Sequence, residues 1–425
     1  MNLTPEQRAL GRRNFMKAAA GTPALALLGA AALKRGPVKG GPVRLGFIGV
    51  GGEGRVLLEQ TDPAFGEVRA LCDVNPAQLA KADEVLARTG RPPARHYSEW
   101  REMLEKESLE AVVIAVPLWM HAEVTAGCLD AGRHVLCEKM MAWDVEGCER
   151  MLAAARRSGR LLEIGYQRHY NPIYQAAYDG VIKRDVLGEV YHVRLAWHRN
   201  GNWRRSGEPP SADYDPSRWG YPSFEHLLNW RLYWRYSKGL FAELASHQLE
   251  VVNWFLGARP EAVQAAGGIY RFKDGREVYD HVYATFEYPQ GRTALFSSIE
   301  SNAFDDYYEM FLGTKGTLIL KGETEAYLFE EGSGARAATL ELAARGAGPA
   351  LEASESRAGD AARAPRSATP DTIERVAAYR LEVSGFCSAV RTGTPLLCGP
   401  ERAVESARAC LRANEAVAGR ARLSV

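Results

Sequence analysis

The chain has 425 residues, more than one compact core usually accommodates, so its length predicts two domains. Its 53 basic and 52 acidic residues nearly cancel, which argues against nucleic acid or an anionic surface as a partner. None of the seven cysteines forms a CxxC pair, so we predict neither a metal site nor a disulfide framework.

The N-terminus carries an arginine pair, Arg12-Arg13, ahead of a weakly apolar run at residues 21–33. This pattern resembles a twin-arginine export signal, and the run is shorter than the roughly 20 apolar residues that span a bilayer. We therefore predict a signal segment over residues 1–35, the twin-arginine export machinery as a partner, and a periplasmic or otherwise exported protein with no stable membrane span. A basic amphipathic tail is the alternative. A Gly/Pro-rich linker follows at residues 36–42.

From residue 43 the pattern alternates short apolar strands with helices. Strands are predicted at residues 43–49, 68–72, 111–116, 134–137 and 161–164, and helices at 53–60, 76–88, 123–131 and 145–157. The run 111–116 is apolar throughout, as expected for a central parallel strand covered on both faces. This alternation predicts an α/β fold, a Rossmann-like doubly wound parallel sheet over residues 43–165.

Beyond residue 165 the strands become longer and alternate between apolar and polar residues. They are predicted at residues 189–197, 262–272, 281–288, 292–301 and 317–320, with a hairpin turn at 289–291. We expect a second, α+β domain over residues 166–425, with a large, mainly antiparallel, open-faced sheet and two closing helices that begin at Ile373 and Glu401. Residues 333–370 are rich in Ala, Arg, Gly, Ser and Pro, which predicts a mobile insertion.

The segment GVGGEG at residues 49–54 satisfies GxGxxG after a predicted strand and before a helix, and Asp73 ends the next strand. The first glycine permits the tight turn, the second admits a pyrophosphate, and the third brings helix and strand together. Asp73 is suited to bind ribose hydroxyls and to repel a 2′-phosphate, so NAD is predicted, with NADP kept as an alternative by Arg55. A glycine turn without a ligand is the other alternative. The cofactor residues are Gly49, Val50, Gly51, Gly52, Glu53, Gly54 and Asp73.

Four further motifs follow in order: AVPLWMH at residues 115–121, EKM at 138–140, GYQR at 165–168 and ELASHQLE at 243–250. Together with the glycine loop they resemble the Gfo/Idh/MocA family of sugar and polyol oxidoreductases. The resemblance runs from residue 43 to the end, except for residues 333–370. It implies NAD(P)-dependent oxidation of a CH–OH group in a sugar, a sugar derivative or a cyclic polyol. Family members are often dimers or tetramers, so a homo-oligomer is expected.

In that family a Glu-Lys-Pro sequence ends the fifth strand, and its lysine reaches the nicotinamide and the substrate. The resemblance implies this role for Lys139 and a proton-handling role for His247. Two departures are Met140 in place of the proline and Glu243 in place of an aspartate. Because a cis bond before a residue other than proline costs about 2.5–4 kcal/mol, we expect the Lys139–Met140 bond to be trans.

The spacing of Glu243, His247 and Glu250 puts all three on one face of a regular helix. A carboxylate one turn from an imidazole can orient it and raise its basicity, so Glu243 is predicted to orient His247. A helix cap or an interdomain ion pair is the alternative.

The other candidate residues come from the same motifs and from a segment in which five tryptophans alternate with arginines, Trp197 to Trp234. Aromatic faces suit sugar C–H groups and arginines suit hydroxyls or carboxylates, whereas a subunit interface is the alternative reading. Further cofactor contacts are expected from Pro117, His121, Glu138, Lys139 and Gln167, with helix capping as the alternative for His121. The predicted catalytic residues are Lys139, His247 and Glu243, and the predicted substrate contacts are Lys139, Arg168, Trp203, Arg204, Glu243 and His247.

These assignments predict a dehydrogenase in which His247 takes the hydroxyl proton and Lys139 stabilises the developing alkoxide. An exported enzyme meets no free nicotinamide pool, so its cofactor should stay bound and be restored within each cycle. The runner-up is an NAD-dependent glycoside hydrolase that works by transient oxidation, elimination and re-reduction, with Tyr166 or Tyr170 as an extra base. A non-catalytic sugar-binding protein is the third reading.

Overall fold

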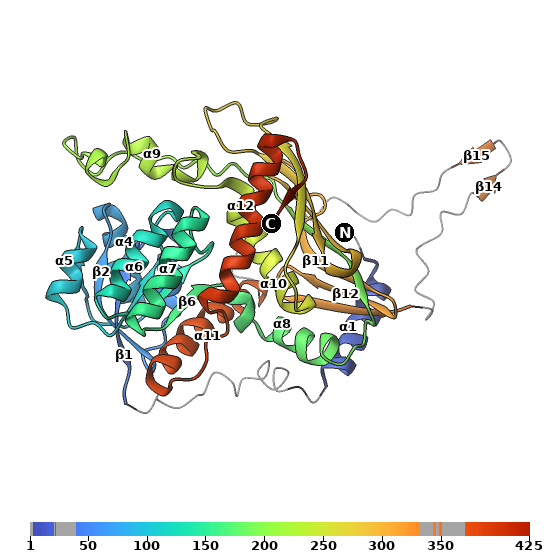
Figure 1. Ribbon diagram of the computed structural model, residues 1–425, viewed down its shortest axis with the longest axis horizontal. Coiled ribbons are helices and arrows are strands. Elements are labelled where there is room, and N and C mark those ends of the chain that lie inside the picture. Colours follow the sequence, from blue (N-terminus) through green and yellow to red (C-terminus); the bar gives the residue numbers. More distant parts are fainter. Residues whose placement is uncertain (1–2, 21, 23–39, 332–342, 346–347, 351–369) are drawn as a thin grey trace.

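The computed structural model describes residues 3–20, 22, 40–331, 343–345, 348–350 and 370–425. Figure 1 shows two sheets joined by long helices. The N-terminal sheet has six parallel strands in the order β3-β2-β1-β4-β5-β6, which confirms the predicted doubly wound fold. Its strands are β1 (Val43–Ile48), β2 (Gly66–Cys72), β3 (Arg95–Tyr97), β4 (Ala111–Ile114), β5 (His134–Glu138) and β6 (Leu162–Gly165).

The strand order reverses between β1 and β4, the position where open α/β sheets bind ligands beyond the carboxyl ends of their strands. The helices that flank this sheet are α3 (Gly52–Gln60), α4 (Pro76–Arg88), α5 (Trp100–Lys106), α6 (His121–Asp130) and α7 (Val145–Ser158). Helix α4 has the predicted bounds because Asn75 caps its first turn and Pro76 occupies its first position. Strand β3 was not predicted, since its three residues are partly or largely exposed and carry no apolar run.

The second sheet has eight strands in the order β13-β12-β11-β7-β10-β9-β8-β16, and only the β7–β10 pair is parallel. The mainly antiparallel sheet is therefore confirmed. Its strands are β7 (Val190–His198), β8 (Ala262–Gly268), β9 (His281–Tyr288), β10 (Arg292–Ile299), β11 (Tyr307–Gly313), β12 (Gly316–Lys321), β13 (Glu325–Glu330) and β16 (Leu423–Ser424). Strand β8 ends four residues before the predicted position, because Asp280 accepts hydrogen bonds from the backbone N–H groups of residues 270–272 and curls them into a loop.

Three further helices are α10 (Ser246–Leu256), α11 (Pro370–Thr392) and α12 (Pro400–Gly419), and α12 lies between the two sheets (Figure 1). Helix α12 contacts α7 of the first domain and β8 of the second. Helix α11 follows the second sheet in sequence but packs against the first, where Phe386 and Cys387 join the hydrophobic core around Leu45. The C-terminal part of the chain thus helps to hold the six-stranded sheet in place.

Shorter helical segments lie in the loops between these elements. They are η2 (Leu118–Met120), η3 (Gln167–Tyr170), α8 (Pro172–Ala177), η4 (Tyr178–Ile182), η5 (Pro216–Trp219), α9 (Phe224–Leu228), η6 (Trp230–Leu232), η7 (Phe241–Ala245) and η8 (Pro289–Gly291).

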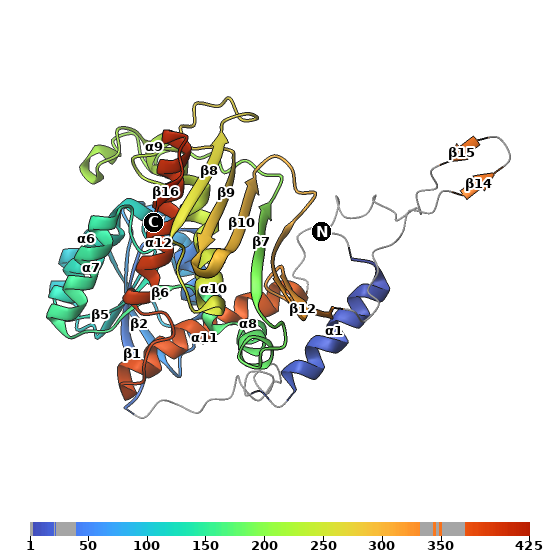
Figure 2. The ribbon, with the colours of Figure 1, turned by 45° about the vertical axis from the view of Figure 1, so that its right-hand side comes forward.

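The N-terminal helix α1 (Pro5–Ala19) packs against β13, at the edge of the eight-stranded sheet. Figure 2 shows it beside this edge, far from the six-stranded parallel sheet. Phe15 and Ala19 are buried, and Arg12 pairs with Glu325. A Cβ atom at Gly11 would lie 2.8 Å from Phe329 Cζ and 2.9 Å from Tyr327 Cβ, so this close approach needs glycine.

The predicted signal and insertion fall largely on residues that the structure does not describe. Of the apolar run at 21–33 only Thr22 is described. Of the insertion at 333–370, the description covers the short strands β14 (Ala343–Arg345) and β15 (Gly348–Ala350) and the start of α11. Among the described helices, none combines the length and the hydropathy that crossing a bilayer requires.

Substitution of Gly11 tests the docking of α1. We expect Gly11→Val to displace the helix, because the added side chain overlaps the rings of Tyr327 and Phe329. The measurement is the rate of trypsin cleavage after Arg12, Arg13 or Lys17, which should rise at least about tenfold as the local opening free energy falls. Ala9→Val, on the exposed face of the same helix, is the control. Equal cleavage of both variants would contradict the docked position.

Candidate active site

The glycine loop between β1 and α3 leaves room for a ligand at two positions and none at the others. Gly49 has φ +85°, and a Cβ there would lie 2.6 Å from the Ala115 carbonyl oxygen. A Cβ on Gly54 would overlap the Gly49 carbonyl oxygen. At Gly51 and Gly52, by contrast, a Cβ would meet nothing within 4 Å. The first and last glycines therefore close the turn, and the middle pair, at the N-terminus of α3, leaves the space that a pyrophosphate needs.

Asp73, at the end of β2, holds this loop in place. Its carboxylate accepts hydrogen bonds from the backbone N–H groups of Val50 (2.9 Å) and Asn75 (2.8 Å). Burial raises the pKa of Asp73 to about 6, although both hydrogen bonds and Arg55 favour the ionised form. Arg55 itself donates to the Val50 carbonyl oxygen (2.9 Å) and to Gln78 (2.5 Å). Arg55, the residue for which NADP was kept as an alternative, thus donates its hydrogen bonds to other residues of the protein.

Strand β5 ends in Glu138, and Lys139 begins the loop that follows. The Lys139–Met140 peptide bond is cis, so the prediction of a trans bond is wrong. The energetic cost of a cis bond before a residue other than proline suggested a trans bond, but contacts with the surrounding protein hold this segment. Met140 is buried, its carbonyl oxygen lies 2.9 Å from His121 Nδ1, and the Lys139 N–H donates to Glu138 Oε2.

Glu138 is almost fully buried at this strand end. Burial, and then the charge of Glu53, raise its pKa. Its Oε1 atom accepts no hydrogen bond within the described part of the chain. A buried carboxyl with a free oxygen is suited to a hydrogen bond with a polar group of a cofactor.

Lys139 joins the two domains directly. Its Nζ donates to the backbone carbonyl oxygen of Glu243 at 3.0 Å. Glu243 lies in η7, a π-helical turn that runs into α10. Each backbone ring of a π-helix closes one residue later than in an α-helix, so the regular i, i+4 alignment is lost here.

The prediction that Glu243 orients His247 is consequently wrong. The Glu243 carboxylate accepts instead from Arg231 Nε (3.0 Å) and Ser237 Oγ (3.2 Å). Burial opposes its ionisation, but Arg231 and Lys139 outweigh burial and lower its pKa. Glu250, expected on the same face, pairs with His169 at 3.1 Å.

His247 is held by aromatic rings. Tyr166 meets it edge to face at a centroid distance of 6.1 Å, and Trp197 lies tilted at 5.7 Å. The side chain is 7% exposed, and its Nδ1 has no partner among the residues described. Burial, followed by the charges of Lys139 and Arg168, lowers its pKa well below 6.5. His247 is therefore a neutral imidazole with an unused ring nitrogen, the state that a general base requires.

His121 supports the site without facing it. It is 2% exposed, and its two ring nitrogens lie 2.9 and 3.0 Å from the carbonyl oxygens of Met140 and Val116. The assignment to cofactor binding is corrected to a role in holding two backbone segments. Pro117, between β4 and η2, is half-buried beside these carbonyls.

Arg168 does not reach the cleft, which corrects its assignment to the substrate. It is 1% exposed, and it pairs with Glu309 (2.5 Å) and Glu323 (2.8 Å) beneath the eight-stranded sheet. Gln167 is also buried, with its Nε2 3.5 Å from Glu323. Both residues fasten η3 to the second domain, and the cofactor contact expected of Gln167 stays a prediction.

Residues 199–236 form a cap that crosses from the eight-stranded sheet to the nucleotide-binding domain, which Figure 1 shows around α9. Trp119 donates to Tyr221 Oη at 2.8 Å, and Tyr214 donates to the Val74 carbonyl oxygen at 3.0 Å, next to Asp73. Trp203, predicted to contact the substrate, is half-buried beneath the guanidinium of Arg199 at 4.3 Å.

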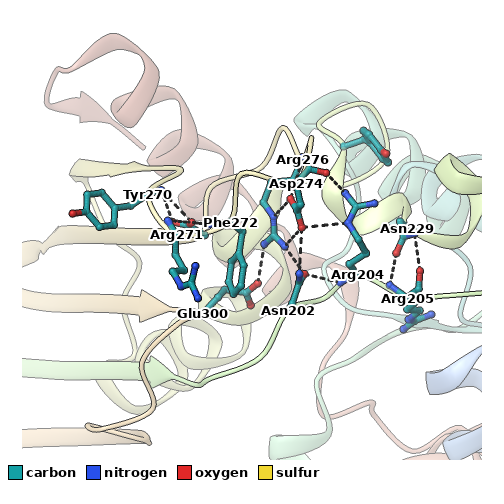
Figure 3. A network of polar contacts seen from close by, with 12 residues as sticks. Asn202, Arg204, Arg205, Asn229, Tyr270, Arg271, Phe272, Asp274, Arg276 and Glu300 are labelled. Atoms are coloured by element: carbon teal, nitrogen blue, oxygen red, sulfur yellow. Dashed lines mark hydrogen bonds and ion pairs between the residues drawn. The ribbon is translucent and has the colours of Figure 1, made fainter.

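Figure 3 shows what holds the cap at its sheet end. Arg204 donates to the Asp274 carboxylate (3.2 Å) and carbonyl oxygen (2.7 Å), and it pairs with Glu225. Arg276 binds Asp274 and Asn202. Arg204 is thus an anchor of the cap, which corrects its assignment to the substrate.

Sequence reasoning missed Arg231 and Ser237, which hold Glu243. Arg231 belongs to the Trp/Arg segment that had been singled out, but nothing local identified its partner 12 residues away. A buried cluster of His169, Glu250 and Cys398 brings three ligand-type atoms within 4.8 Å of one another. The absence of a metal site thus stays a prediction.

Comparisons with known proteins cover both domains. The profile of the Gfo/Idh/MocA group described as "Oxidoreductase family, NAD-binding Rossmann fold" matches residues 43–166. Its companion, "Oxidoreductase family, C-terminal alpha/beta domain", matches residues 180–425. These matches follow the two sheets.

A curated relative, the glycosyl hydrolase family 109 protein 2 of Phocaeicola vulgatus, is 31% identical over 166 residues, 36% of this chain and 38% of that protein. The chain thus matches about two fifths of the relative's length. Solved structures resemble the whole fold. The WlbA dehydrogenase of Bordetella pertussis, in complex with NADH and UDP-GlcNAcA, has a TM-score of 0.66 at 19% identity, over 90% of this chain and 99% of that one. The aldose-aldose oxidoreductase of Caulobacter crescentus has a TM-score of 0.65 at 20% identity, over 90% and 100%.

Asp73 is predicted to make dinucleotide binding depend on pH. Its carboxylate must be ionised to accept from ribose hydroxyls, so NAD affinity should fall as the pH drops through about 6. Asp73→Asn should bind NAD about tenfold or more weakly at pH 7, since a charged acceptor is lost, and without this pH dependence. Calorimetric titration at pH 7.5 and 5 measures both effects, with the surface variant Asp83→Asn as control. Unchanged affinity in Asp73→Asn would remove Asp73 from the site.

Arg168 is predicted to act on stability. Arg168→Met leaves Glu309 and Glu323 buried without their cation, so the free energy of unfolding should fall by about 3–5 kcal/mol. Arg157→Met removes a surface pair with Asp130 and should cost less than about 1 kcal/mol. Urea unfolding compares the two variants. Full stability together with an altered substrate KM would restore Arg168 to the substrate site.

Proposed function

The chain belongs to the Gfo/Idh/MocA family of NAD-binding oxidoreductases, and we propose that it oxidises a CH–OH group of a sugar, sugar derivative or cyclic polyol with an NAD that stays bound between turnovers. The observation that carries this proposal is the bond from Lys139 to the π-helical turn that leads directly into the helix of His247. Lys139 extends from the end of β5 to the Glu243 carbonyl oxygen, and His247, one helical turn on, is a neutral base with a free Nδ1.

Each residue of the site has its own role in the proposed reaction. Bound NAD supplies the hydride acceptor, and the glycine loop with Asp73 supplies its binding site. His247 takes the proton of the substrate hydroxyl, because its low pKa keeps the imidazole neutral. Lys139 donates a hydrogen bond to the same oxygen as negative charge develops there. Glu243, fixed by Arg231 and Ser237, holds the lysine end through its backbone carbonyl.

Two contacts of the cap support retention of the cofactor. Tyr214 binds the Val74 carbonyl beside Asp73, and Trp119 binds Tyr221 on the other side of the β1/β4 switch point. Opening this cap breaks both bonds, which slows exchange of a ligand beneath it. Retention also suits an exported enzyme, a location that the Arg12-Arg13 pair and the apolar run support.

A homo-oligomer is proposed through the open face of the eight-stranded sheet. Tyr283 and Leu295 are 45% and 42% exposed there. Leu295 lies opposite Thr285 in the β9–β10 ladder, and residues two apart in a strand share a face. Tyr283 and Leu295 therefore lie on the same surface, where a second copy would cover them.

The second candidate function is glycoside hydrolysis by transient oxidation, which the names of the partly matching relatives favour. The tyrosines considered as an extra base are already engaged. Tyr166 Oη accepts from Ser406 at 3.2 Å, and Tyr170 donates to Glu163 at 2.5 Å. Such a hydrolase would have to use another group for that proton transfer.

The test is a spectrum of the purified protein before and after exposure to candidate substrates. We expect a reduced-nicotinamide absorbance band to appear with an aldose or cyclic polyol and to bleach with a second, carbonyl substrate. Free sugar released from a glycoside without net NADH would replace the first candidate by the second. A protein that binds no dinucleotide would refute both.

Lys139→Met and His247→Gln are expected to lower kcat/KM by about 10²–10⁴ while dinucleotide binding persists. His96→Gln, a surface change, is the control. Because His247 must be neutral, the acid limb of the wild-type kcat/KM profile should lie below pH 6.5, and it should vanish in His247→Gln. An acid limb above pH 7 that both proteins share would assign the base to another residue.

A further inference from the structure

Three buried side chains of the kinds that bind transition metals meet where three segments of the chain come together. They are His169 of η3, Glu250 of α10 and Cys398 of the loop before α12, and these residues are 2%, 1% and 0% exposed. One ligand atom of each lies within 4.8 Å of the other two. No short motif reveals this cluster, because 81 residues separate the first two members and Cys398 lies beyond both.

Packing and backbone hydrogen bonds hold these residues in position. The His169 ring packs against Trp254 at a centroid distance of 4.5 Å, and its Nε2 lies 3.1 Å from Glu250 Oε1. The carbonyl oxygen of Cys398 accepts a hydrogen bond from the N–H of Ile164, within β6, at 3.0 Å. Ligand atoms that the fold already holds together lose little freedom when they bind an ion.

Glu250 has a charge and an oxygen atom that its surroundings leave open. Two other buried glutamates of the second domain, Glu243 and Glu309, each pair with an arginine. In the described part of the chain Glu250 pairs with His169 alone, and its Oε2 accepts no hydrogen bond. A buried carboxylate is costly without a cation beside it, and so is a buried oxygen without a partner. A metal ion at this point relieves both costs.

The types of ligand select the metal. A thiolate, an imidazole and a carboxylate together suit Zn²⁺, whereas Mg²⁺ and Ca²⁺ take oxygen ligands. Bonds of about 2.0–2.3 Å in a tetrahedron separate ligand atoms by about 3.3–3.6 Å, which the spacing of this cluster admits. The Cys398 thiol, which forms no disulfide, releases its proton on coordination. The thiolate and the carboxylate then balance the two charges of the ion.

We infer that His169, Glu250 and Cys398 form a zinc site, with a fourth position open to a water molecule. This inference goes beyond the proposed function, and it replaces the expectation, drawn from the cysteine spacing, that the chain has no metal site. The ion joins η3 and the loop before α12 to α10. Because Glu250 follows His247 on the same helix, the zinc ion also fixes the helix that carries the proposed base.

The test measures metal content, which depends on neither cofactor nor turnover. The full chain is produced in zinc-supplemented medium, passed over a chelating resin and analysed by mass spectrometry for zinc. Wild type should hold about one ion per chain, and Cys398→Ser and Glu250→Gln less than about one fifth of that. Cys387→Ser is the matched control and should keep the full content, because Cys387 is equally buried but lies in the core of the first sheet.

Cobalt tests the cysteine ligand directly. Protein produced with Co²⁺ in zinc-depleted medium should show a thiolate-to-cobalt absorption band, measured with any bound cofactor oxidised. Cys398→Ser should lose this band, whereas Cys387→Ser should keep it. Thermal unfolding checks the fold of each variant. If Cys398→Ser does not fold, the zinc content of Glu250→Gln and the cobalt band of wild type decide the question.

A wild-type protein with neither zinc nor the cobalt band would overturn the inference and leave a plain ion pair between His169 and Glu250. Equal zinc content in all three variants would overturn it too, since the ion would then be bound elsewhere. Neither result affects the proposed function, which the nicotinamide spectrum tests separately. A protein that holds zinc but no dinucleotide would refute the proposed function and support the zinc site.

Discussion

The hydrogen bond from Lys139 Nζ to the Glu243 carbonyl oxygen is the constraint on which the site depends. Its donor stands at the end of a parallel strand and its acceptor in the π-helical turn of the other domain. A backbone carbonyl fixes the distance between domains more firmly than a flexible carboxylate would. The Glu243 carboxylate is thereby left for Arg231 and Ser237, and the chain beyond it delivers His247 to the same cleft.

The rest of the structure keeps these two surfaces facing each other. Helix α12 contacts both domains, and α11 returns to complete the core of the first sheet. The buried pairs of Arg168 with Glu309 and Glu323 tie the loop after β6 to the second sheet. Such pairs add little net stability compared with apolar packing, but a misplaced domain would leave their charges unpaired. They are a means of specifying one arrangement of the two domains.

The sequence predicts a structural feature well when the residues that determine it are neighbours in the chain. Helix α4 was predicted residue by residue, because Asn75, Pro76 and the apolar spacing all lie within it. The glycine loop was equally readable, since the steric need at Gly49 and Gly54 is created by neighbouring backbone. The open eight-stranded sheet followed from alternation, but three of its strands were missed.

The predictions that failed concern features that contacts with distant parts of the chain determine. The π-helical turn at residues 241–245 has no periodic signature, so a regular helix was assumed and Glu243 was assigned to His247. Arg168 and Arg204 were taken for substrate contacts because their residue type suits a sugar, whereas their carboxylate partners lie 70 to 155 residues away or in another loop. The cis bond before Met140 is likewise imposed by surroundings that the local pattern does not contain.

The docking of α1 against β13 constrains the order in which parts of the chain can fold. Arg12 and Glu325 are separated by 313 residues of sequence, so a ribosome must complete most of the chain before this contact can form. During synthesis the N-terminal helix is available to any other molecule that binds it, and the finished edge of the eight-stranded sheet then competes for the same face. The contact between α1 and β13 can thus form only after the strands of the C-terminal domain have been made and folded.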